Sequence, residues 1–252
     1  MIDALARISR DPDSFARLLS EMNGAGIDRA VLFPEDSGVP ARLISDFRKR
    51  DPKRFAVVAA VDPLAGDASR AIEDARFEWG AVGVEMTPEE SGRRWLNIPS
   101  VMPLWEKLEA LGIRVSLCIA SQNYNQFSDV VTSFPRLRIV LEDLGSGPGT
   151  MLSQYVPILL EYARYPQVYV SISRLFRLSS LPYPYTDLWP VLEEIRAAFG
   201  PDRLVWGSGY PEVLSAAGGY GGAAGLLREL PFFSPADRDM IQDTNAARLW
   251  FD

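Results

Sequence analysis

The chain of 252 residues contains no histidine and only one cysteine, Cys118. The absence of histidine removes both the usual general base at neutral pH and the most common metal ligand. A closed zinc site, and a nucleophile activated by histidine within one subunit, are therefore excluded. A single cysteine also excludes an internal disulfide, which fits the reducing cytoplasm in which we expect the protein to act.

The sequence also lacks long apolar runs and basic clusters. No run approaches the roughly 20 apolar residues of a membrane-spanning helix. The first 15 residues do not have the basic and then apolar pattern of a signal peptide. The formal net charge of −7 disfavours binding to nucleic acid or to anionic membranes. We therefore expect a cytoplasmic protein whose partner is a small-molecule substrate.

Short apolar runs alternate with amphipathic stretches along the whole chain. Near-continuous apolar strands separated by helical patterns predict a parallel sheet covered by helices. Eight such units favour an α/β fold of the (β/α)8 TIM-barrel type in a single domain, residues 1–252, over a doubly wound open sheet. The predicted strands are residues 1–6, 29–33, 55–61, 81–86, 113–119, 137–143, 168–173 and 203–208.

The order of motifs resembles the amidohydrolase-related family of metal-dependent decarboxylases and hydrolases, which includes aminocarboxymuconate-semialdehyde decarboxylase and γ-resorcylate decarboxylase. The matching segments follow the family order over nearly the whole chain. The resemblance implies an amidohydrolase-like barrel with its site at the carboxyl ends of the strands. The segments include "DPKRFAVVAAVDP" (51–63), "GAVGVEM" (80–86), "FPRLRIVLEDLG" (134–145) and "FGPDRLVWGSGYP" (199–211).

The resemblance also implies five positions for the ligands of a divalent metal. Members usually hold the metal with a His-x-His pair, one or two further histidines and an aspartate. Here these positions carry Leu5, Arg7, Cys118, Asp143 and Gly209. Because Cys118 and Asp143 alone could bind a metal, and two unlike ligands are too few, we expect no metal and no other cofactor.

The charges at these positions suggest a different chemistry. We expect Asp143 to face the mouth of the barrel and its neighbour Glu142 to face the helices, because adjacent strand residues point to opposite sides. Arg7 should then form an ion pair with Asp143 at the vacated metal position. The pair would either bind a substrate carboxylate or oxyanion, with Asp143 as orienting group or general base, or merely fill a dead cavity.

Two more residues are candidates for catalysis. Glu85, in "GVEM", is a candidate acid or base with a raised pKa, or else one half of a salt bridge across the mouth to Arg174. Cys118 is a candidate nucleophile if Arg7 lowers the pKa of its thiol, or else a small apolar filler. Asp62 is expected to cap a loop.

Polar residues that follow other strands could bind the substrate. The candidates are Asn123, Ser171, Arg174 and Tyr210. The segment "GGYGGAAG" (218–225) is interpreted as a flexible loop at the mouth rather than a dinucleotide fingerprint. A helix is expected to begin at Ser234.

These features favour a metal-independent enzyme, a lyase, isomerase, cyclase or hydrolase, that acts on an organic acid or a cyclic metabolite by acid–base chemistry. Glu85 and Asp143 would move protons and Arg7 would hold negative charge. The alternative is a catalytically inactive barrel with a binding or assembly role. The family resemblance makes a homodimer conceivable, while the sequence names neither substrate nor reaction.

Overall fold

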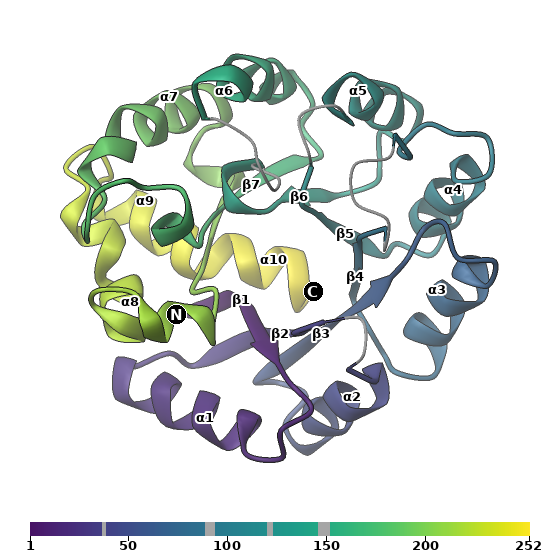
Figure 1. Ribbon diagram of the computed structural model, residues 1–252, viewed down its shortest axis with the longest axis horizontal. Coiled ribbons are helices and arrows are strands. Elements are labelled where there is room, and N and C mark those ends of the chain that lie inside the picture. Colours follow the sequence, from purple (N-terminus) through teal and green to yellow (C-terminus); the bar gives the residue numbers. More distant parts are fainter. Residues whose placement is uncertain (37–38, 89–93, 120–122, 146–151) are drawn as a thin grey trace.

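A computed structural model describes residues 1–36, 39–88, 94–119, 123–145 and 152–252. Eight parallel strands form one sheet in sequential order, and helices surround it (Figure 1). The first and last strands close the ring through a parallel bridge between Ala6 and Tyr210. The backbone N–H of Gly209 also donates to the Leu5 carbonyl over 3.0 Å. The predicted α/β fold of the (β/α)8 TIM-barrel type is therefore confirmed.

All eight predicted strands are present, and two of them have the predicted bounds. The strands are β1 (Ile2–Ile8), β2 (Arg29–Pro34), β3 (Phe55–Val61), β4 (Gly83–Met86), β5 (Arg114–Leu117), β6 (Ile139–Leu141), β7 (Val168–Ser173) and β8 (Leu204–Gly207). The helices are α1 (Ser14–Ala25), α2 (Ala41–Arg50), α3 (Ala68–Phe77), α4 (Met102–Ala110), α5 (Tyr124–Ser133), α6 (Leu152–Glu161), α7 (Trp189–Phe199), α8 (Gly219–Glu229), α9 (Pro235–Asp239) and α10 (Asn245–Trp250).

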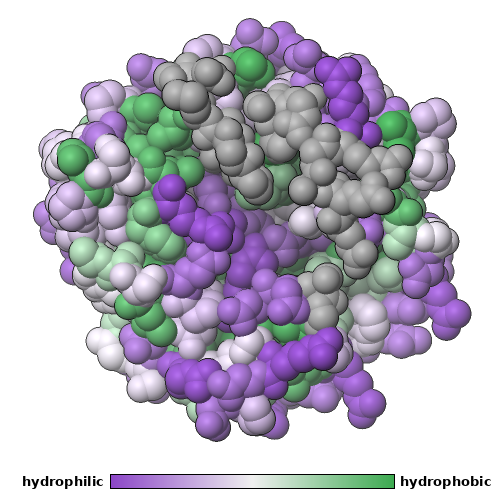
Figure 2. Space-filling view, viewed as in Figure 1, coloured by the Kyte–Doolittle hydropathy of each residue, from purple (hydrophilic) through white to green (hydrophobic). Residues whose placement is uncertain are grey.

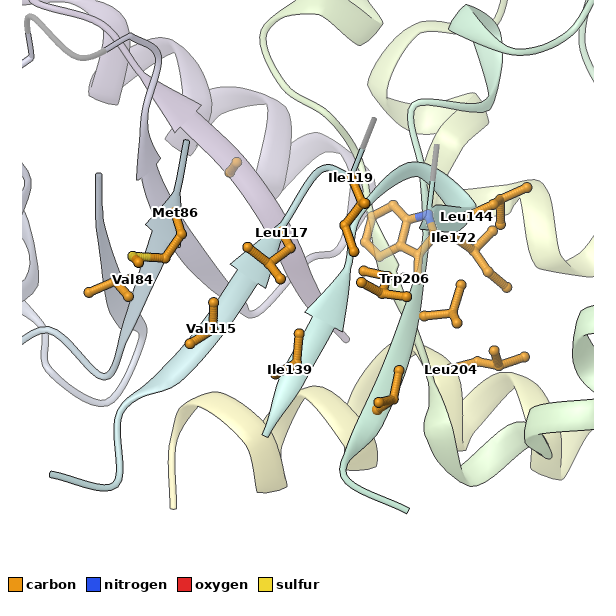
Figure 3. Close-up of a cluster of buried hydrophobic side chains, with 14 of the residues drawn as sticks. Val84, Met86, Val115, Leu117, Ile119, Ile139, Leu144, Ile172, Leu204 and Trp206 are labelled. Carbon is orange, nitrogen blue, oxygen red and sulfur yellow. The ribbon is translucent and has the colours of Figure 1, made fainter. Parts of the chain in front are cut away.

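Apolar side chains fill two separate layers of the barrel. The larger layer lies between the strands and the surrounding helices, and Figure 3 shows part of it along β4 to β8. The smaller layer lies inside the barrel, where Leu249 and Trp250 of α10 pack on the strands. Gly83 is required at this contact, because a Cβ atom there would lie 2.5 Å from the Trp250 ring. Helix α10 thus plugs the end of the barrel opposite the strands' carboxyl ends.

A bulge in β1 decides which side chains of that strand face inward. The register of β1 against β2 shifts between Asp3 and Ala6. As a result both Ala4 and Leu5 belong to the inner layer, whereas Ala6 belongs to the outer one. Alternation then carries Arg7 to the interior. Without the extra residue Arg7 would point toward the helices.

The buried carboxylate of Asp3 ties this bulge to the closing strand. It accepts hydrogen bonds from the Leu5 N–H over 3.1 Å, from the Ser208 N–H over 2.8 Å and from the Ser208 hydroxyl over 2.6 Å. The Tyr220 hydroxyl of α8 donates a fourth over 2.9 Å. A buried carboxylate is tolerated when its oxygens are satisfied in this way. Asp3 therefore fixes the geometry of the contact between β1 and β8, where the barrel closes.

Two other predictions concern the start of a helix at Ser234 and the glycine-rich segment 218–225. The helix expected from Ser234 is confirmed, since Ser234 and Asp237 form a reciprocal capping box at the start of α9. The interpretation of residues 218–225 as a flexible loop is wrong, because residues 219–225 lie in α8. The ring of Tyr183 packs over Gly218 and Gly222, so the small residues serve close packing. No helix among the described residues is long and apolar enough to cross a membrane.

Candidate active site

Five buried charged residues meet inside the mouth of the barrel: Arg7, Glu85, Glu142, Asp143 and Arg174. Arg7 and Glu85 form a bidentate pair, with distances of 2.6 Å from Nη2 to Oε1 and 2.9 Å from Nη1 to Oε2. Nη1 also donates to the Pro34 carbonyl over 3.0 Å, and the guanidinium lies 5.5 Å from the Phe33 ring centroid. Arg7 thus faces inward as expected, and its closest carboxylate comes from β4.

Glu142 lies between the two guanidinium groups, so its expected outward orientation is wrong. Its Oε2 accepts from Arg7 Nη2 over 3.2 Å and from Arg174 Nη2 over 2.8 Å. Its Oε1 accepts from the Ser116 hydroxyl of β5 over 2.7 Å. The physical reason is the alternation along β6, in which Val140 belongs to the inner layer and the residue two positions later points the same way.

Asp143 pairs with Arg174, and the expected Arg7–Asp143 ion pair is wrong. Asp143 Oδ1 accepts from Arg174 Nε over 2.8 Å and from the Ser173 hydroxyl over 3.0 Å. Asp143 and Arg174 both have positive backbone φ angles, 51° and 45°, which residues other than glycine rarely adopt. Strand β6 has therefore ended before Asp143, and strand alternation no longer predicts its direction. Strained residues of this kind cluster at functional sites.

Burial and ion pairing shift the pKa values of the three carboxyl groups in different directions. Burial raises the pKa of Glu85, and the attraction of Arg7 only partly offsets this. Burial likewise raises the pKa of Asp143 against the attraction of Arg174. Burial would also raise the pKa of Glu142, but the charges of Arg7 and Arg174 and the Ser116 hydroxyl hold it below its ordinary value. Glu142 is therefore held as the anion, while the raised pKa of Glu85, which also lines the cleft, makes Glu85 the candidate for proton exchange.

Arg7 and Glu85 also line a cleft of about 520 Å³. The cleft lies over the carboxyl ends of β2, β3 and β4, and hydrophilic side chains gather at the centre of this face of the barrel (Figure 2). Its other charged lining residues are Glu35, Asp36, Asp62 and Asp67. Asp62 Oδ1 accepts from the Leu64 N–H over 2.8 Å, which confirms its expected role in a turn. Small apolar and polar residues line the rest.

The remaining sequence candidates lie outside this cleft. Burial, with Asp143 and Glu142 nearby, raises the pKa of the Cys118 thiol, which contradicts the condition for a nucleophile, a pKa lowered by Arg7, and favours the alternative of a small apolar filler. Tyr210 is buried against α1 and α8, and its hydroxyl donates to the Ser14 carbonyl over 3.3 Å. Ser171 donates to the Ser173 hydroxyl over 3.0 Å. Asn123 is buried, and its Oδ1 lacks a hydrogen-bond partner in the described parts of the chain.

Sequence reasoning missed Ser116 and the acidic lining of the cleft. Ser116 is a polar residue within the apolar strand β5, directly paired with Glu85 in the sheet. That isolated serine, two positions before Cys118, was the available signal. Glu35 and Asp36 directly follow β2, and Asp67 directly precedes α3, so all three positions could have been found at the strand and helix boundaries.

The residues at the implied metal positions do not fit a divalent ion. Two guanidinium groups lie at the centre of the mouth and engage its carboxylates. At Gly209, where the family carries an aspartate, a Cβ atom would lie 2.3 Å from Cγ of Arg174. The arginine side chain thus occupies the space that a ligand at this position needs. Among the described residues no group of three or more acidic, cysteine or histidine side chains could hold a metal ion.

The closed barrel with a polar mouth defines the class of protein, and the chain belongs to the amidohydrolase family, whose model matches residues 4–251. L-fucono-1,5-lactonase from Burkholderia ambifaria is 26% identical over 205 residues, which cover 78% of this chain and 69% of that protein. A probable 2-pyrone-4,6-dicarboxylic acid hydrolase from Acinetobacter baumannii has a similar structure, with a TM-score of 0.82, 16% identity and coverage of 100% and 99%.

A further structural relative is 2,6-dihydroxybenzoate decarboxylase from Rhizobium, with a TM-score of 0.71 and 16% identity, covering 98% of this chain and 97% of that one. At these identities the two structures show the fold alone. The expected resemblance to the amidohydrolase-related decarboxylases and hydrolases is therefore confirmed.

Proposed function

We propose that the protein is a metal-independent enzyme that hydrolyses a small cyclic ester by acid–base chemistry. One observation carries the proposal: the buried pair of Glu85 and Arg7 lines the 520 Å³ cleft. A base needs a pKa near the working pH, and an ester hydrolase needs a fixed cation at the developing oxyanion. The lactonase name of the sequence relative favours a cyclic ester over the other substrates that the sequence left open.

In this proposal Glu85 takes a proton from water while the water oxygen bonds to the ester carbonyl carbon. The negative charge that develops on the carbonyl oxygen is stabilised by Arg7, which its two carboxylate neighbours keep protonated. The ring C–O bond then breaks, and protonated Glu85 gives its proton to the departing alkoxide. Lactone and water become a hydroxy acid, and no metal or cofactor takes part.

Asp143 then has a positioning role rather than the proton-transfer role expected from the sequence. It is bonded to Arg174 and Ser173 and is not among the residues that line the cleft. Arg174 in turn donates to Oε2 of Glu142, the same oxygen that accepts from Arg7. The pair of Asp143 and Arg174 thus keeps Glu142 in place, and Glu142 keeps Arg7 cationic and oriented.

The experiment is a pH-stat assay of wild-type protein and Glu85→Gln with a panel of five- and six-membered lactones. Because Glu85→Gln removes the proposed general base, it should lower kcat/KM by about 10²–10⁴-fold. Glu106→Gln, at an exposed position of α4, is the matched control and should leave turnover unchanged. Prior dialysis against EDTA should not reduce the wild-type rate. Turnover that survives Glu85→Gln, or that disappears with the chelator and returns with zinc, would overturn the mechanism.

A second candidate function, binding without catalysis, is favoured by one specific observation. Both oxygens of Glu85 are engaged by Arg7, as expected of a pair that only fills a cavity. This alternative predicts lactone binding without hydrolysis in the wild-type protein, with equal affinity in Glu85→Gln. The same panel, measured by calorimetry, separates the two candidates.

A further inference from the structure

One residue of the barrel wall is exposed. Along the eight strands, all of which lie in the described parts of the chain, every residue is buried or half-buried except Ala60 of β3. Ala56 and Val58 belong to the inner layer, so alternation directs Ala60, two positions later, into the mouth of the barrel. Ala60 also lines the cleft. The cleft therefore reaches the wall of the barrel at this residue.

Ala60 lies between the two residues of the proposed reaction. In the register of β3 and β4 it is paired directly with Glu85, and neighbouring strands lie about 4.8 Å apart. Arg7 comes from β1, two strands away on the other side of β3, and reaches across to Glu85 over 2.6 Å. The Arg7–Glu85 pair thus spans the part of the mouth formed by β2 and β3, and Ala60 lies within that part (Figure 1).

The opposite side of the Arg7–Glu85 pair is filled by protein. Glu142, directly after β6, accepts from Arg7 over 3.2 Å, and it is held in turn by Arg174 over 2.8 Å and by Ser116 over 2.7 Å. These three residues are not among those that line the cleft. A molecule in the cleft therefore meets Arg7 and Glu85 from the side on which Ala60 lies.

The small side chain at position 60 leaves room beside the charged pair. Barrels of this type usually fill their interior with bulky branched side chains, whereas Ala60 contributes a single methyl group. An ester carbonyl held at Arg7 and Glu85 brings the ring atoms bonded to it over this methyl group. The cleft of about 520 Å³ lies within the size range of sites for drug-sized ligands, so it has space for more than a bare five-membered ring.

From this geometry we infer that Ala60 determines the substrate specificity of the proposed reaction. The ring carbon bonded to the ester carbonyl packs on its methyl group, and the side chain at position 60 limits the substituent that this carbon can carry. The inference rests on the proposed function and assigns its substrate class as lactones with a short alkyl group on that ring carbon. Ala60 itself moves no proton.

The test compares γ-butyrolactone with α-propyl-γ-butyrolactone, which differ only at the ring carbon bonded to the carbonyl. The pH-stat assay gives kcat/KM for both lactones, and the wild-type protein should hydrolyse the propyl compound at least as well as the unsubstituted one. In Ala60→Leu the ratio of the two values, propyl over unsubstituted, should fall at least ~10-fold. The matched control, Ala197→Leu, makes the same change at an exposed position of α7 and should keep the ratio.

A second variant covers a failure of Ala60→Leu to fold. Ala60→Val places a smaller, β-branched side chain at an exposed strand position, where strands favour such residues, and should lower the ratio at least ~3-fold. Thermal melting followed by circular dichroism shows which variants are folded. A ratio that stays unchanged in the folded variants, including an equal loss for both lactones, or a wild-type protein that rejects the propyl compound, would overturn the inference.

Calorimetry with the same two lactones separates this inference from the proposed function. Hydrolysis that is lost in Glu85→Gln, together with an unchanged ratio in Ala60→Leu, would uphold the proposed function and overturn the role of Ala60. Binding of the propyl lactone that weakens in Ala60→Leu, without hydrolysis of either lactone by the wild-type protein, would overturn the proposed function and leave the role of Ala60 standing. Absence of binding of both lactones would overturn both.

Discussion

Removing Glu142 should destabilise the fold far more than removing Glu85, although both carboxylates bind Nη2 of Arg7. The pKa of Glu142 is lowered, so the fold favours its charged form. That charge contributes stability above its ordinary pKa of 4.5, and the contribution is lost as the pH falls through the lowered pKa in the folded state. The pKa of Glu85 is raised, so its charge costs stability once the pH rises above the unfolded-state value.

The loss of stability in each variant depends on which hydrogen-bond partners the arginines keep after the substitution. Glu142→Met leaves Nη2 of Arg174 without a carboxylate, and loss of one partner of a buried pair costs about 3–5 kcal/mol. With about 2.1 cal/mol/K of unfolding entropy per residue, a chain of 252 residues then melts roughly 6–10 °C lower. Glu85→Met leaves Arg7 bonded to Pro34 and Glu142, and should cost less, because the raised pKa of Glu85 means that its charge is net unfavourable to the fold at pH 7.

Urea unfolding at pH 7, followed by circular dichroism, gives the free energy of unfolding of Glu142→Met and of Glu85→Met. The control is Glu106→Met, an exposed position at which the free energy of unfolding should change by no more than about 0.5 kcal/mol. The difference between wild type and Glu142→Met should shrink when the measurement is repeated at about pH 4, toward the lowered pKa. Equal losses for Glu142→Met and Glu85→Met, or a larger loss for Glu85→Met, would refute the assignment of Glu142 as the stabilising anion.

Three further predictions concern single positions. Gly209→Ala should lower the free energy of unfolding by more than about 2 kcal/mol, because its φ is +73° and its Cβ would meet Arg174, whereas Gly24→Ala in α1, with open space around it, should raise it by ~0.5–1 kcal/mol in the same urea titrations. Cys118 should react slowly with iodoacetamide at pH 8 in the folded state and rapidly in urea, and fast alkylation of the folded protein would contradict the raised thiol pKa. Ser234→Ala should lower the melting temperature through a loss of about 1 kcal/mol from the α9 capping box, and an unchanged temperature would show that the cap contributes nothing.

The fold was predictable from the sequence because each strand carries a short apolar run and each helix a periodic one. These signals are local, and closure of the barrel follows from the number of units. Strands β4, β5, β6 and β8 are shorter than predicted. At β6 the predicted strand runs to Asp143, yet the strand ends at Leu141, because Asp143 and Leu144 adopt left-handed conformations. Neither aspartate nor leucine at these positions predicts a left-handed backbone conformation from the sequence.

The site was predictable in its location and in the orientation of Arg7 and Glu85, but not in its pairing. Glu85 follows plain alternation along β4. The inward position of Arg7 depends on a bulge between Asp3 and Ala6 that no turn residue marks; the family alignment, rather than the strand pattern, indicated it. The pairing was assigned wrongly because alternation counted from Asp143 turns Glu142 outward, whereas alternation counted from Val140 turns it inward. Pairing depends on contacts among four strands, and such contacts leave no local pattern.

The proposed reaction changes the charge of the molecule bound beside Arg7. Hydrolysis of a cyclic ester turns a neutral ring carbonyl into a carboxylate, so the net charge of the bound molecule falls by one when its proton is released. In the proposed mechanism the new carboxylate lies beside Glu85 and Arg7, where Glu85 already occupies both outer nitrogens of Arg7. Repulsion from Glu85 would then weaken binding of the product. The Arg7–Glu85 pair would therefore act both on the bond that breaks and on release of the product.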